Sequence, residues 1–320
     1  MVNRKPIVVV GSINMDLVAR TPRIPMAGET ITGTGFETTP GGKGANQAVA
    51  VARLGYPVTI IGLVGEDVFG GALLGNLASA GVDVAPVARV SGPSGIAQIL
   101  VADRGENSIV VVPGANGRVE PEYIYQRERI IRSAGMVLCQ LELPMPTVSH
   151  TLELCARSGV PVMLDPAPAA PLPDSAWPRI AWFTPNEHEA AFYAGGDLSV
   201  EDAARHLLAR GLNAVAFKRG RDGCYIATAD NKVNRVPAFA VDAIDTVGAG
   251  DCFNGAFAVA ILEGQDPPVA ARFAAAAAAI SVTRRGAQAS MPSRSEVESF
   301  LQRRSQASGG KGAARIGANS

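Results

Sequence analysis

Short apolar runs recur along the chain, and their lengths suit β-strands. Val8 to Val10 forms an uninterrupted apolar run that ends at Gly11, which is typical of a strand buried on both faces of a parallel sheet. Runs of the same kind predict strands at 58–64, 136–141, 160–164, 180–183 and 214–218. A further pair of apolar segments, at 224–228 and 232–236, has the spacing of a hairpin.

Segments with helical periodicity lie between most of these runs. The first is closed by Gly55 and Pro57, and the second by Gly81, as helix ends commonly are. The predicted helices occupy 45–54, 68–80, 200–210, 252–263, 269–284 and 295–304, with two more that start after Pro146 and at Glu187. Because strands and helices alternate, the sequence predicts an α/β fold with a doubly wound, mostly parallel central sheet and helices on both faces.

Several segments in the first third of the chain do not fit this central sheet. Those at 17–20 and 29–36 surround prolines and a glycine, and 96–112 has the pattern of a hairpin around an Asp-Arg-Gly-Glu turn. We therefore expect a small separate β-sheet built from about 17–20, 29–36, 85–90 and 96–112. The fold would form one domain over 1–304, and the Gly-, Ala- and Ser-rich segment 305–320 would be a disordered tail.

The composition narrows the classes of protein to which the chain can belong. The chain has 320 residues, of which 47% are hydrophobic and 18% charged, so it can bury a large core. The formal net charge is zero, which excludes the basic field that a nucleic-acid partner needs. No apolar run reaches the ~18 residues of a membrane span, and the polar start lacks a signal-peptide layout. We expect a cytoplasmic protein whose four cysteines are reduced and buried.

Three loops that connect a strand to the following helix carry candidate chemistry, and open α/β sheets bind ligands at this edge. The most specific is the Asp-Thr-Val-Gly-Ala-Gly-Asp sequence at 245–251, which is neither a Walker A nor a G-x-G-x-x-G motif. Its glycines expose backbone N–H groups at a helix N-terminus, where the helix dipole favours a phosphoryl group. Asp251 would lie at the helix start, where its carboxylate can reach a sugar hydroxyl, unless it is an ordinary N-cap.

The second loop is the Gly-Gly-Lys-Gly-Ala-Asn-Gln sequence at 41–47. Gly42 allows the backbone to approach a ligand closely, and Lys43 and Asn46 would lie on one face at the start of a helix. Such amide and ammonium donors suit an uncharged sugar. A flexible loop with a solvated lysine would have the same composition, so the sequence leaves that alternative open.

Two further polar pairs follow predicted strands. Asn14 and Asp16 come just after the first strand, where they suit adjacent sugar hydroxyls or a simple turn. Asn186 and Glu189, in the third loop, are three residues apart at a helix start and could share the water shell of a magnesium ion. The alternative for this second pair is a helix cap with acidic residues in the first turn.

Four segments resemble, in order and spacing, the signatures of the ribokinase-like (PfkB) carbohydrate kinases: Asn-Met-Asp at 14–16, Gly-Gly-Lys-Gly-Ala-Asn-Gln-Ala at 41–48, Asn-Glu-His-Glu at 186–189 and Asp-Thr-Val-Gly-Ala-Gly-Asp at 245–251. The resemblance runs from about Ile7 to Leu301. Within the family, the segments at 41–48, 140–142 and 284–290 are similar to those of members that phosphorylate ribose. The resemblance therefore implies ATP-dependent phosphorylation of D-ribose at O5. It leaves open 2-deoxyribose, nucleosides or fructose as acceptors, and a catalytically silent sugar or nucleotide sensor.

The resemblance also implies a role for each matching residue. Asp251 would be the general base, with a catalytic anion hole formed by Gly248, Ala249 and Gly250. The residues implied to hold the sugar are Asn14, Asp16, Gly42, Lys43, Asn46, Glu142 and Asp251. Those implied to hold ATP are Asn186, Lys218, Arg219, Gly220, Asp222, Gly223 and Gly250.

Two cations and a second subunit are implied in the same way. Glu189 would order the waters of Mg²⁺. A K⁺ ion would be surrounded, mostly through backbone carbonyls, by Asp245, Val247, Ser281, Arg284, Gly286 and Ser290. The small sheet would be a lid over the sugar that also pairs two subunits in a homodimer. One departure from the family pattern is the pair Lys218 and Arg219, which could contact ATP phosphates or face solvent.

Overall fold

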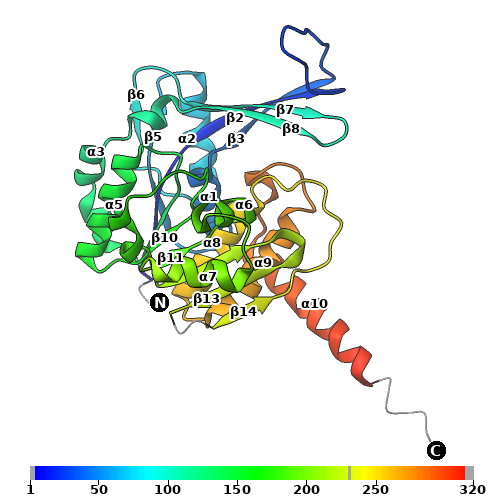
Figure 1. Ribbon diagram of the computed structural model, residues 1–320. Coiled ribbons are helices and arrows are strands. Elements are labelled where there is room, and N and C mark those ends of the chain that lie inside the picture. The colour runs from blue at the N-terminus through cyan, green and yellow to red at the C-terminus, as the bar shows by residue number, and fades with distance from the viewer. Residues whose placement is uncertain (1–3, 230–231, 314–320) are drawn as a thin grey trace, which may run out of the picture.

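The structure is a computed structural model that describes residues 4–229 and 232–313 of the chain. Within these residues, a central sheet of eight strands has the order β14-β13-β12-β11-β10-β9-β1-β4 (Figure 1). The strands from β12 to β4 run parallel, and β13 and β14 extend the sheet antiparallel. The strands are β1 (Ile7–Val10), β4 (Val58–Ile61), β9 (Met136–Cys139), β10 (Val162–Leu164), β11 (Trp182–Phe183), β12 (Ala214–Lys218), β13 (Cys224–Thr228) and β14 (Val233–Val236). The predicted fold class is confirmed.

Helices cover both faces of this sheet because its central strands are apolar on both faces. In β1, Ile7 and Val9 belong to one buried core, and Val8 and Val10 belong to the other. The first core packs against α1 (Lys43–Arg53), α2 (Val68–Ser79), α8 (Ala249–Leu262), α9 (Pro267–Ser281) and α10 (Arg294–Ala313). The second packs against α3 (Pro121–Tyr125), α4 (Glu128–Ser133), α5 (Met145–Ser158), α6 (Glu187–Ala194) and α7 (Val200–Ala209). Among the described residues, no helix combines the length and the apolar character needed to cross a membrane.

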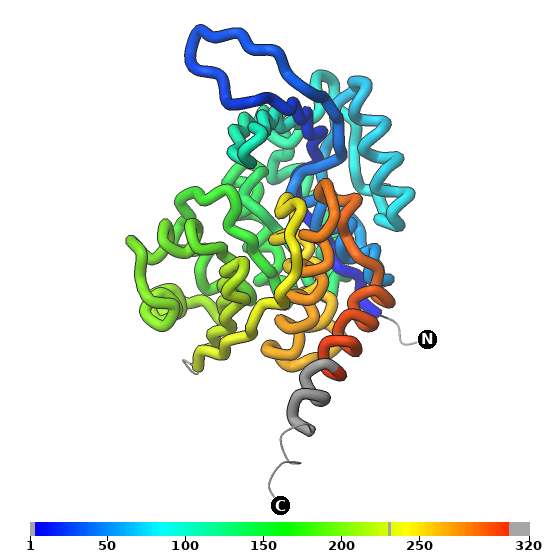
Figure 2. The backbone as a smooth tube through the Cα atoms, turned by 90° about the vertical axis from the view of Figure 1, so that its right-hand side faces the viewer, coloured from blue at the N-terminus to red at the C-terminus, as the bar shows by residue number. Residues whose placement is uncertain are grey.

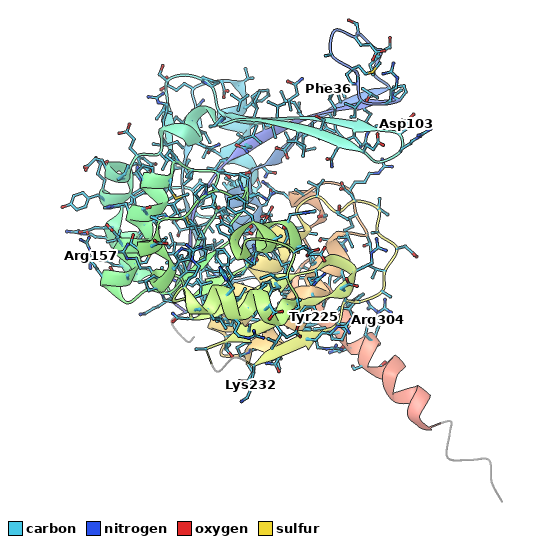
Figure 3. All side chains as sticks on the ribbon, in the orientation of Figure 1. Phe36, Asp103, Arg157, Tyr225, Lys232 and Arg304 are labelled. Atoms are coloured by element: carbon cyan, nitrogen blue, oxygen red, sulfur yellow. The ribbon has the colours of Figure 1, made fainter. Side chains whose placement is uncertain are left out.

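A second sheet, here called the lid sheet, extends away from the central sheet (Figure 1). Its strands have the order β3-β2-β7-β8, and they are β2 (Asn14–Thr21), β3 (Gly35–Gly41), β7 (Gly95–Ala102) and β8 (Asn107–Val112). The loop between β2 and β3 projects from the molecule (Figure 2). Phe36, in β3, and Asp103, in the turn between β7 and β8, both lie far from the central sheet (Figure 3). Because β2 follows β1 directly, the lid sheet begins where the first central strand ends.

The strand expected at 29–36 lies later in the chain. It occupies Gly35–Gly41, because its ladder with β2 pairs Gly35 with Arg20 and Gly41 with Asn14. The residues before it form a turn instead, in which Glu29 donates its backbone N–H to the carbonyl of Met26 at 3.0 Å.

The segment expected at 85–90 is not part of the lid sheet. Ala88–Val90 forms β6, which pairs with β5 (Leu63–Gly65) in a separate two-stranded sheet. The hydroxyl of Tyr123 accepts the N–H of Ala88 at 2.9 Å and donates to the carbonyl of Pro86 at 2.6 Å. These bonds hold the segment against the body of the molecule, which explains why it cannot reach the lid sheet.

The last helix is longer than the sequence predicted. Helix α10 continues to Ala313, so the disorder expected for 305–320 is wrong for 305–313. The hydroxyl of Ser305 donates to the carbonyl of Leu301 at 3.1 Å, one turn back, as a helical residue can. Extending an existing helix by a residue costs much less free energy than nucleating a new one. The composition of the segment alone did not indicate that it continues the preceding helix. The remainder of that prediction, at 314–320, lies outside the described residues.

Candidate active site

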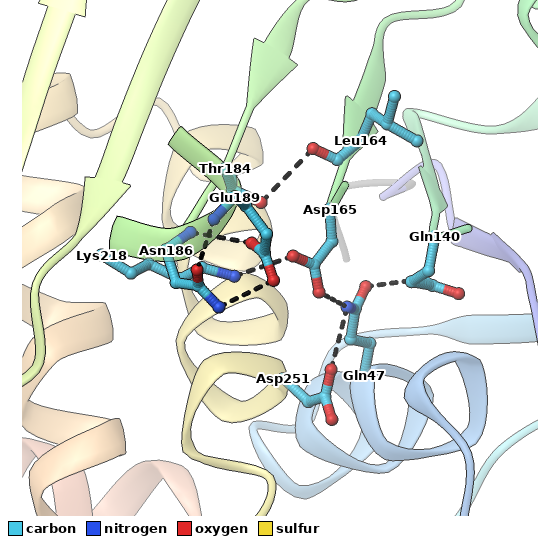
Figure 4. A network of polar contacts seen from close by, with 9 residues as sticks. All are labelled: Gln47, Gln140, Leu164, Asp165, Thr184, Asn186, Glu189, Lys218 and Asp251. Carbon is cyan, nitrogen blue, oxygen red and sulfur yellow. Dashed lines mark hydrogen bonds and ion pairs between the residues drawn. The ribbon is translucent and has the colours of Figure 1, made fainter. Parts of the chain in front are cut away.

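Polar side chains meet at the carboxyl ends of neighbouring central strands (Figure 4). Gln140 follows β9, Asp165 follows β10, Asn186 follows β11, and Lys218 is the last residue of β12. The N-termini of α1 and α8 face the same edge, since their first-turn side chains bond to these residues and to each other. The predicted location of the site, at the carboxyl edge of a parallel sheet, therefore agrees with the contacts.

Asp251 lies in the first turn of α8 and is 5% exposed. Its Oδ2 accepts a hydrogen bond from Asn46 Nδ2 at 2.9 Å, and its Oδ1 accepts one from Gln47 Nε2 at 3.1 Å. Burial raises the pKa of Asp251 to about 6, with Lys43 opposing the shift and Asp165 adding to it. The N-cap of α8 is Gly248, so the interpretation of Asp251 as an ordinary N-cap is wrong.

The glycines before Asp251 leave backbone donors free at the start of α8. Gly248 has a φ of 74°, and a Cβ atom there would lie 2.9 Å from the Cβ of Ala287, so this position requires glycine. The N–H of Ala249 donates to the carbonyl of Thr246. Among the described residues, the N–H groups of Gly250 and Asp251 have no acceptor. They remain available to an anion at the positive end of the helix dipole.

The loop at 41–47 brings backbone and side-chain donors to the same region. Helix α1 begins at Lys43, two residues before the predicted start, with Gly42 as its N-cap. Gly42 has a φ of 87°, and a Cβ there would lie 2.8 Å from the backbone nitrogen of Asn14. The N–H of Lys43 donates to Glu142 Oε2 at 3.0 Å, and the hydroxyl of Ser12 donates to the same oxygen. The flexible-loop alternative is therefore wrong.

The side chain of Lys43 faces several carboxylates. Burial alone would lower the pKa of its ammonium group, but nearby negative charges raise it above the ordinary value. These charges are Asp251, Asp165, Glu142 and Glu189. Lys43 therefore carries a positive charge beside these carboxylates.

Asn14 and Asp16 lie inside strand β2 and not in a turn. Because they are two residues apart in a strand, their side chains point to the same face. Asn14 Oδ1 accepts a hydrogen bond from Nδ2 of the buried Asn116 at 2.6 Å. Asp16 is 8% exposed and accepts no hydrogen bond from any described residue. Burial, together with the charges of Glu142 and Asp251, raises the pKa of Asp16 to about 7.

Asn186 and Glu189 bond to each other at the start of α6. Asn186 Oδ1 accepts the N–H of Glu189 at 2.9 Å, and Glu189 Oε2 accepts the N–H of Asn186 at 2.8 Å. Asn186 and Glu189 thus form a helix cap, which is the alternative that the sequence left open for this pair. Burial raises the pKa of Glu189, while Lys218 opposes the shift and Asp165 adds to it, so these groups are close.

The described residues contain no group of three His, Cys, Asp or Glu side chains that could hold a metal ion. Two neighbouring carboxylates, Asp165 and Glu189, nevertheless fit Mg²⁺, which keeps most of its waters and needs few protein oxygens.

The residues predicted around K⁺ lie on two segments that Asp245 joins. Its Oδ1 accepts the N–H of Val247 at 3.0 Å, and its Oδ2 accepts the N–H of Gly286 at 2.9 Å. The hydroxyls of Ser281 and Ser290 donate to nearby backbone carbonyls, and the side chain of Arg284 pairs with Glu296.

The two adjacent cations at the end of β12 point in different directions. Lys218 Nζ donates to Asp165 Oδ1 at 2.8 Å inside the site. The guanidinium of Arg219 pairs with Glu187 at 2.7 Å on the outside. The following residues form a tight turn, Gly220–Asp222, in which Gly220 has a φ of 47°. Gly223 has a φ of 92°, and a Cβ there would lie 2.1 Å from the carbonyl oxygen of Val236.

Sequence reasoning missed the residues that connect the site internally. Gln47 Nε2 donates to Asp165 Oδ2 at 3.0 Å as well as to Asp251, and Gln140 Nε2 donates to Gln47 Oε1 at 2.7 Å (Figure 4). Gln288 Nε2 likewise donates to Asn46 Oδ1 at 3.1 Å. Asp165 could have been found, because it directly follows a predicted strand at the ligand-binding edge. The glutamines carry no such signal.

Comparison with known proteins finds relatives over nearly the whole chain. Residues 4–294 match the family described as pfkB family carbohydrate kinase. A ribokinase of Bacillus subtilis is 44% identical over 298 residues, which cover 92% of this chain and 99% of that protein. A deoxyribokinase of Salmonella typhimurium is 38% identical over 301 residues, covering 92% of this chain and 98% of that protein. The solved structure of Arabidopsis thaliana ribokinase complexed with ribose and ATP is 36% identical, with a TM-score of 0.87 over 93% of this chain and 99% of that chain.

Proposed function

Because the chain belongs to the pfkB family of carbohydrate kinases, we propose that it transfers the γ-phosphoryl group of ATP to O5 of D-ribose. The products are ribose 5-phosphate and ADP. The observation that carries this proposal is the buried carboxylate of Asp251 beside the free N–H groups of Gly250 and Asp251. A base and an anion pocket thus meet at one point, as phosphoryl transfer requires. The similarity to ribokinases supports ribose as the acceptor.

The residues of the chain act on the two substrates as follows. Asp251 accepts the proton of the O5 hydroxyl as O5 attacks the γ-phosphorus. The O5–P bond forms, the bond from phosphorus to the bridging oxygen breaks, and ADP leaves with that electron pair. The N–H groups of Gly250 and Asp251 stabilise the charge on the transferred group. With a pKa of about 6, Asp251 is ionised at neutral pH and can accept the proton.

The sugar lies between the lid sheet and the start of α1. Asp16 carries the recognition of adjacent hydroxyls, because its buried carboxylate has no hydrogen-bond donor among the described residues. Asn14 shares its face of β2 and is held in place by Asn116. The remaining contacts come from Gly42, Lys43, Asn46 and Glu142.

The nucleotide lies on the opposite side of Asp251, against α6, the end of β12 and the turn after it. It meets Asn186, Lys218, Arg219, Gly220, Asp222, Gly223 and Gly250, with its phosphates at Lys218 and Gly250. Glu189 would order the water ligands of Mg²⁺, and this ion would supply positive charge that offsets the charge of the phosphates. K⁺ would be held by backbone carbonyls of the two segments that Asp245 joins, and it would stiffen the loop before Gly248. Rates measured in potassium, sodium and a bulky organic cation test this second ion, and equal rates would reject it.

The lid sheet closes over the sugar and pairs two subunits. Four consecutive residues of its edge strand β8, Ile109 to Val112, are 45–61% exposed despite their apolar side chains. Phe36 of the opposite edge strand is 69% exposed. Apolar surface of this kind commonly marks an interface. Light scattering should give a dimer mass for the full chain, and Val110→Lys should lower it toward that of the monomer.

The test of the proposed function is ADP release measured with ribose, 2-deoxyribose, fructose and adenosine as acceptors. Ribose should give the largest kcat/KM, because a site built to bond the 2-hydroxyl leaves a buried acceptor unpaired when that hydroxyl is missing. A larger value for 2-deoxyribose would favour the activity named for the Salmonella relative. The absence of any sugar-dependent ADP release would leave only a silent sensor.

A further inference from the structure

The adjacent cations Lys218 and Arg219 differ sharply in burial. The side chain of Lys218 is 13% exposed and that of its partner Asp165 is 3% exposed, whereas Arg219 and Glu187 are 34% and 51% exposed. A buried ion pair loses hydration on both sides and is weak evidence for stability by itself. The burial of Lys218 therefore suggests a ligand with a negative charge and not only a structural pair.

The ammonium group of Lys218 lies over the first turn of α8. A Cβ atom built on Gly250 would be 3.5 Å from Lys218 Nζ, so the nitrogen adjoins the position where the free N–H of Gly250 begins the helix. A lysine ammonium has three donors. One is used by Asp165, and the other two have no acceptor among the described residues. Three donor groups of two kinds thus converge beside Asp251: two backbone N–H groups and this ammonium group.

We propose that Lys218 binds an oxygen of the γ-phosphoryl group itself, the group that moves from ATP to the sugar. This inference rests on the proposed function, because it presumes ATP at the site. The γ-phosphorus must lie between the base that deprotonates the sugar and the departing ADP. Lys218 is next to Gly250, one residue from that base, so its ammonium group reaches the γ-phosphoryl oxygens and not the phosphates that ADP keeps.

The contacts of Asp165 explain how the lysine is kept in register with the base. Asp165 Oδ1 holds Lys218 at 2.8 Å, and its Oδ2 accepts Gln47 Nε2 at 3.0 Å. The same Gln47 nitrogen donates to Asp251 at 3.1 Å (Figure 4). The group that binds the phosphoryl oxygen and the group that accepts the proton are thereby fixed to one framework.

The test compares the binding of ADP and of a non-hydrolysable ATP analogue to Lys218→Met, by calorimetry in the presence of Mg²⁺. The analogue should bind about 10- to 100-fold more weakly than to the unchanged protein, the range for one charge-assisted hydrogen bond. Binding of ADP should stay within about twofold. The control is Arg157→Met, which removes a positive charge from an exposed residue in the last turn of α5, away from the site, and should change neither affinity.

Two outcomes would overturn the proposal. If both nucleotides weaken equally, Lys218 acts on the site as a whole and not on the γ-phosphoryl group. If neither changes, it only pairs with Asp165. If Lys218→Met does not fold, the double variant Lys218→Met with Asp165→Asn removes the uncompensated carboxylate and keeps an acceptor for Gln47. It is compared with Asp165→Asn alone, because Asp165 also fits Mg²⁺. Failure of the proposed function has a different signature, namely nucleotide binding without sugar-dependent ADP release. An unchanged protein that binds no analogue would reject both.

Discussion

The starts of α1 and α6 share one sequence feature and differ in the contacts that this feature makes. Both carry a polar pair three residues apart at the carboxyl edge of the sheet. In α6, Asn186 and Glu189 bond to each other across three residues. In α1, Asn46 bonds to Asp251, which is 205 residues away in the chain, and the N-cap Gly42 makes no side-chain cap bond. A polar pair at a helix start therefore serves either its own helix or a distant partner.

The N-cap residue decides between these outcomes. Asparagine at the N-cap of α6 can accept the N–H of the third helical residue, so the polar groups of that turn are satisfied locally. Glycine at the N-cap of α1 has no side chain to do so. The side-chain amides of Asn46 and Gln47 in α1 are then free to bond to Asp251 and Asp165. This difference predicts catalytic effects from substitutions around α1 and mainly stability effects from substitutions around α6.

The largest effect should come from the residue that α1 holds. Asp251→Asn should fold normally and lose about 10²- to 10⁴-fold of turnover, the usual contribution of a general base. The amide keeps one acceptor for the donors of α1, so thermal unfolding should change little. Ribose-dependent ADP release and the melting temperature measure the two quantities. A variant that retained more than about a tenth of the activity would show that Asp251 is not the base.

The same contrast explains which features of the fold and the site could be predicted from the sequence. The central sheet and the location of the site were predictable, because strand and helix periodicity places polar residues such as Asn186 and Asp251 at one edge. The role of Gln47 was not, since its partner Asp165 is 118 residues away and nothing local marks the contact. The strand at 29–36 was misplaced for a similar reason: its register is set by pairing with β2, which the local pattern does not encode.

The second effect concerns pH. A carboxylate base works only when ionised, and the pKa of Asp251 is raised to about 6. The value of kcat/KM should therefore rise with pH through about 6 and fall at least tenfold for each unit below it, more steeply because Asp16, with a pKa of about 7, is protonated there as well. Asp165→Asn should move this midpoint to lower pH, because the negative charge of Asp165 contributes to the raised pKa. Asp174→Asn is a matched control at an exposed site and should leave the midpoint unchanged. If Asp165→Asn left the midpoint unchanged, the charge of Asp165 would not contribute to the pKa of the base.

The third effect concerns the sugar side of the site, where Asp16 has no local partner. Asp16→Ala should reduce kcat/KM for ribose about tenfold more than for 2-deoxyribose, since only ribose offers the second hydroxyl. The ratio of the two kcat/KM values, before and after the substitution, is the measurement. If Asp16 served only strand β2, the variant would melt at a lower temperature and the ratio would stay the same.

The smallest effect should come from α6, where the comparison can be sharpened most. Asn186→Ala removes the N-cap acceptor and should lower the free energy of unfolding by about 1 kcal/mol. Asn186→Ser keeps an oxygen that can cap the helix, so it should restore most of this stability. Neither variant should change the pH midpoint assigned to Asp251, because Asn186 makes no contact with it among the described residues.

The serine variant separates the two roles considered for Asn186. If the side chain only caps α6, Asn186→Ser should match the unchanged protein in both melting temperature and KM for ATP. If it also contacts the nucleotide, stability returns but KM for ATP stays raised several-fold, because a serine hydroxyl is shorter than the asparagine amide and lacks its NH₂ donors. We expect the second result, since Asn186 follows β11 at the carboxyl edge of the sheet and lies beside Glu189, which is close to Lys218 and Asp165. A full return of both quantities would make α6 a purely local cap and would confine the catalytic contacts to α1 and α8.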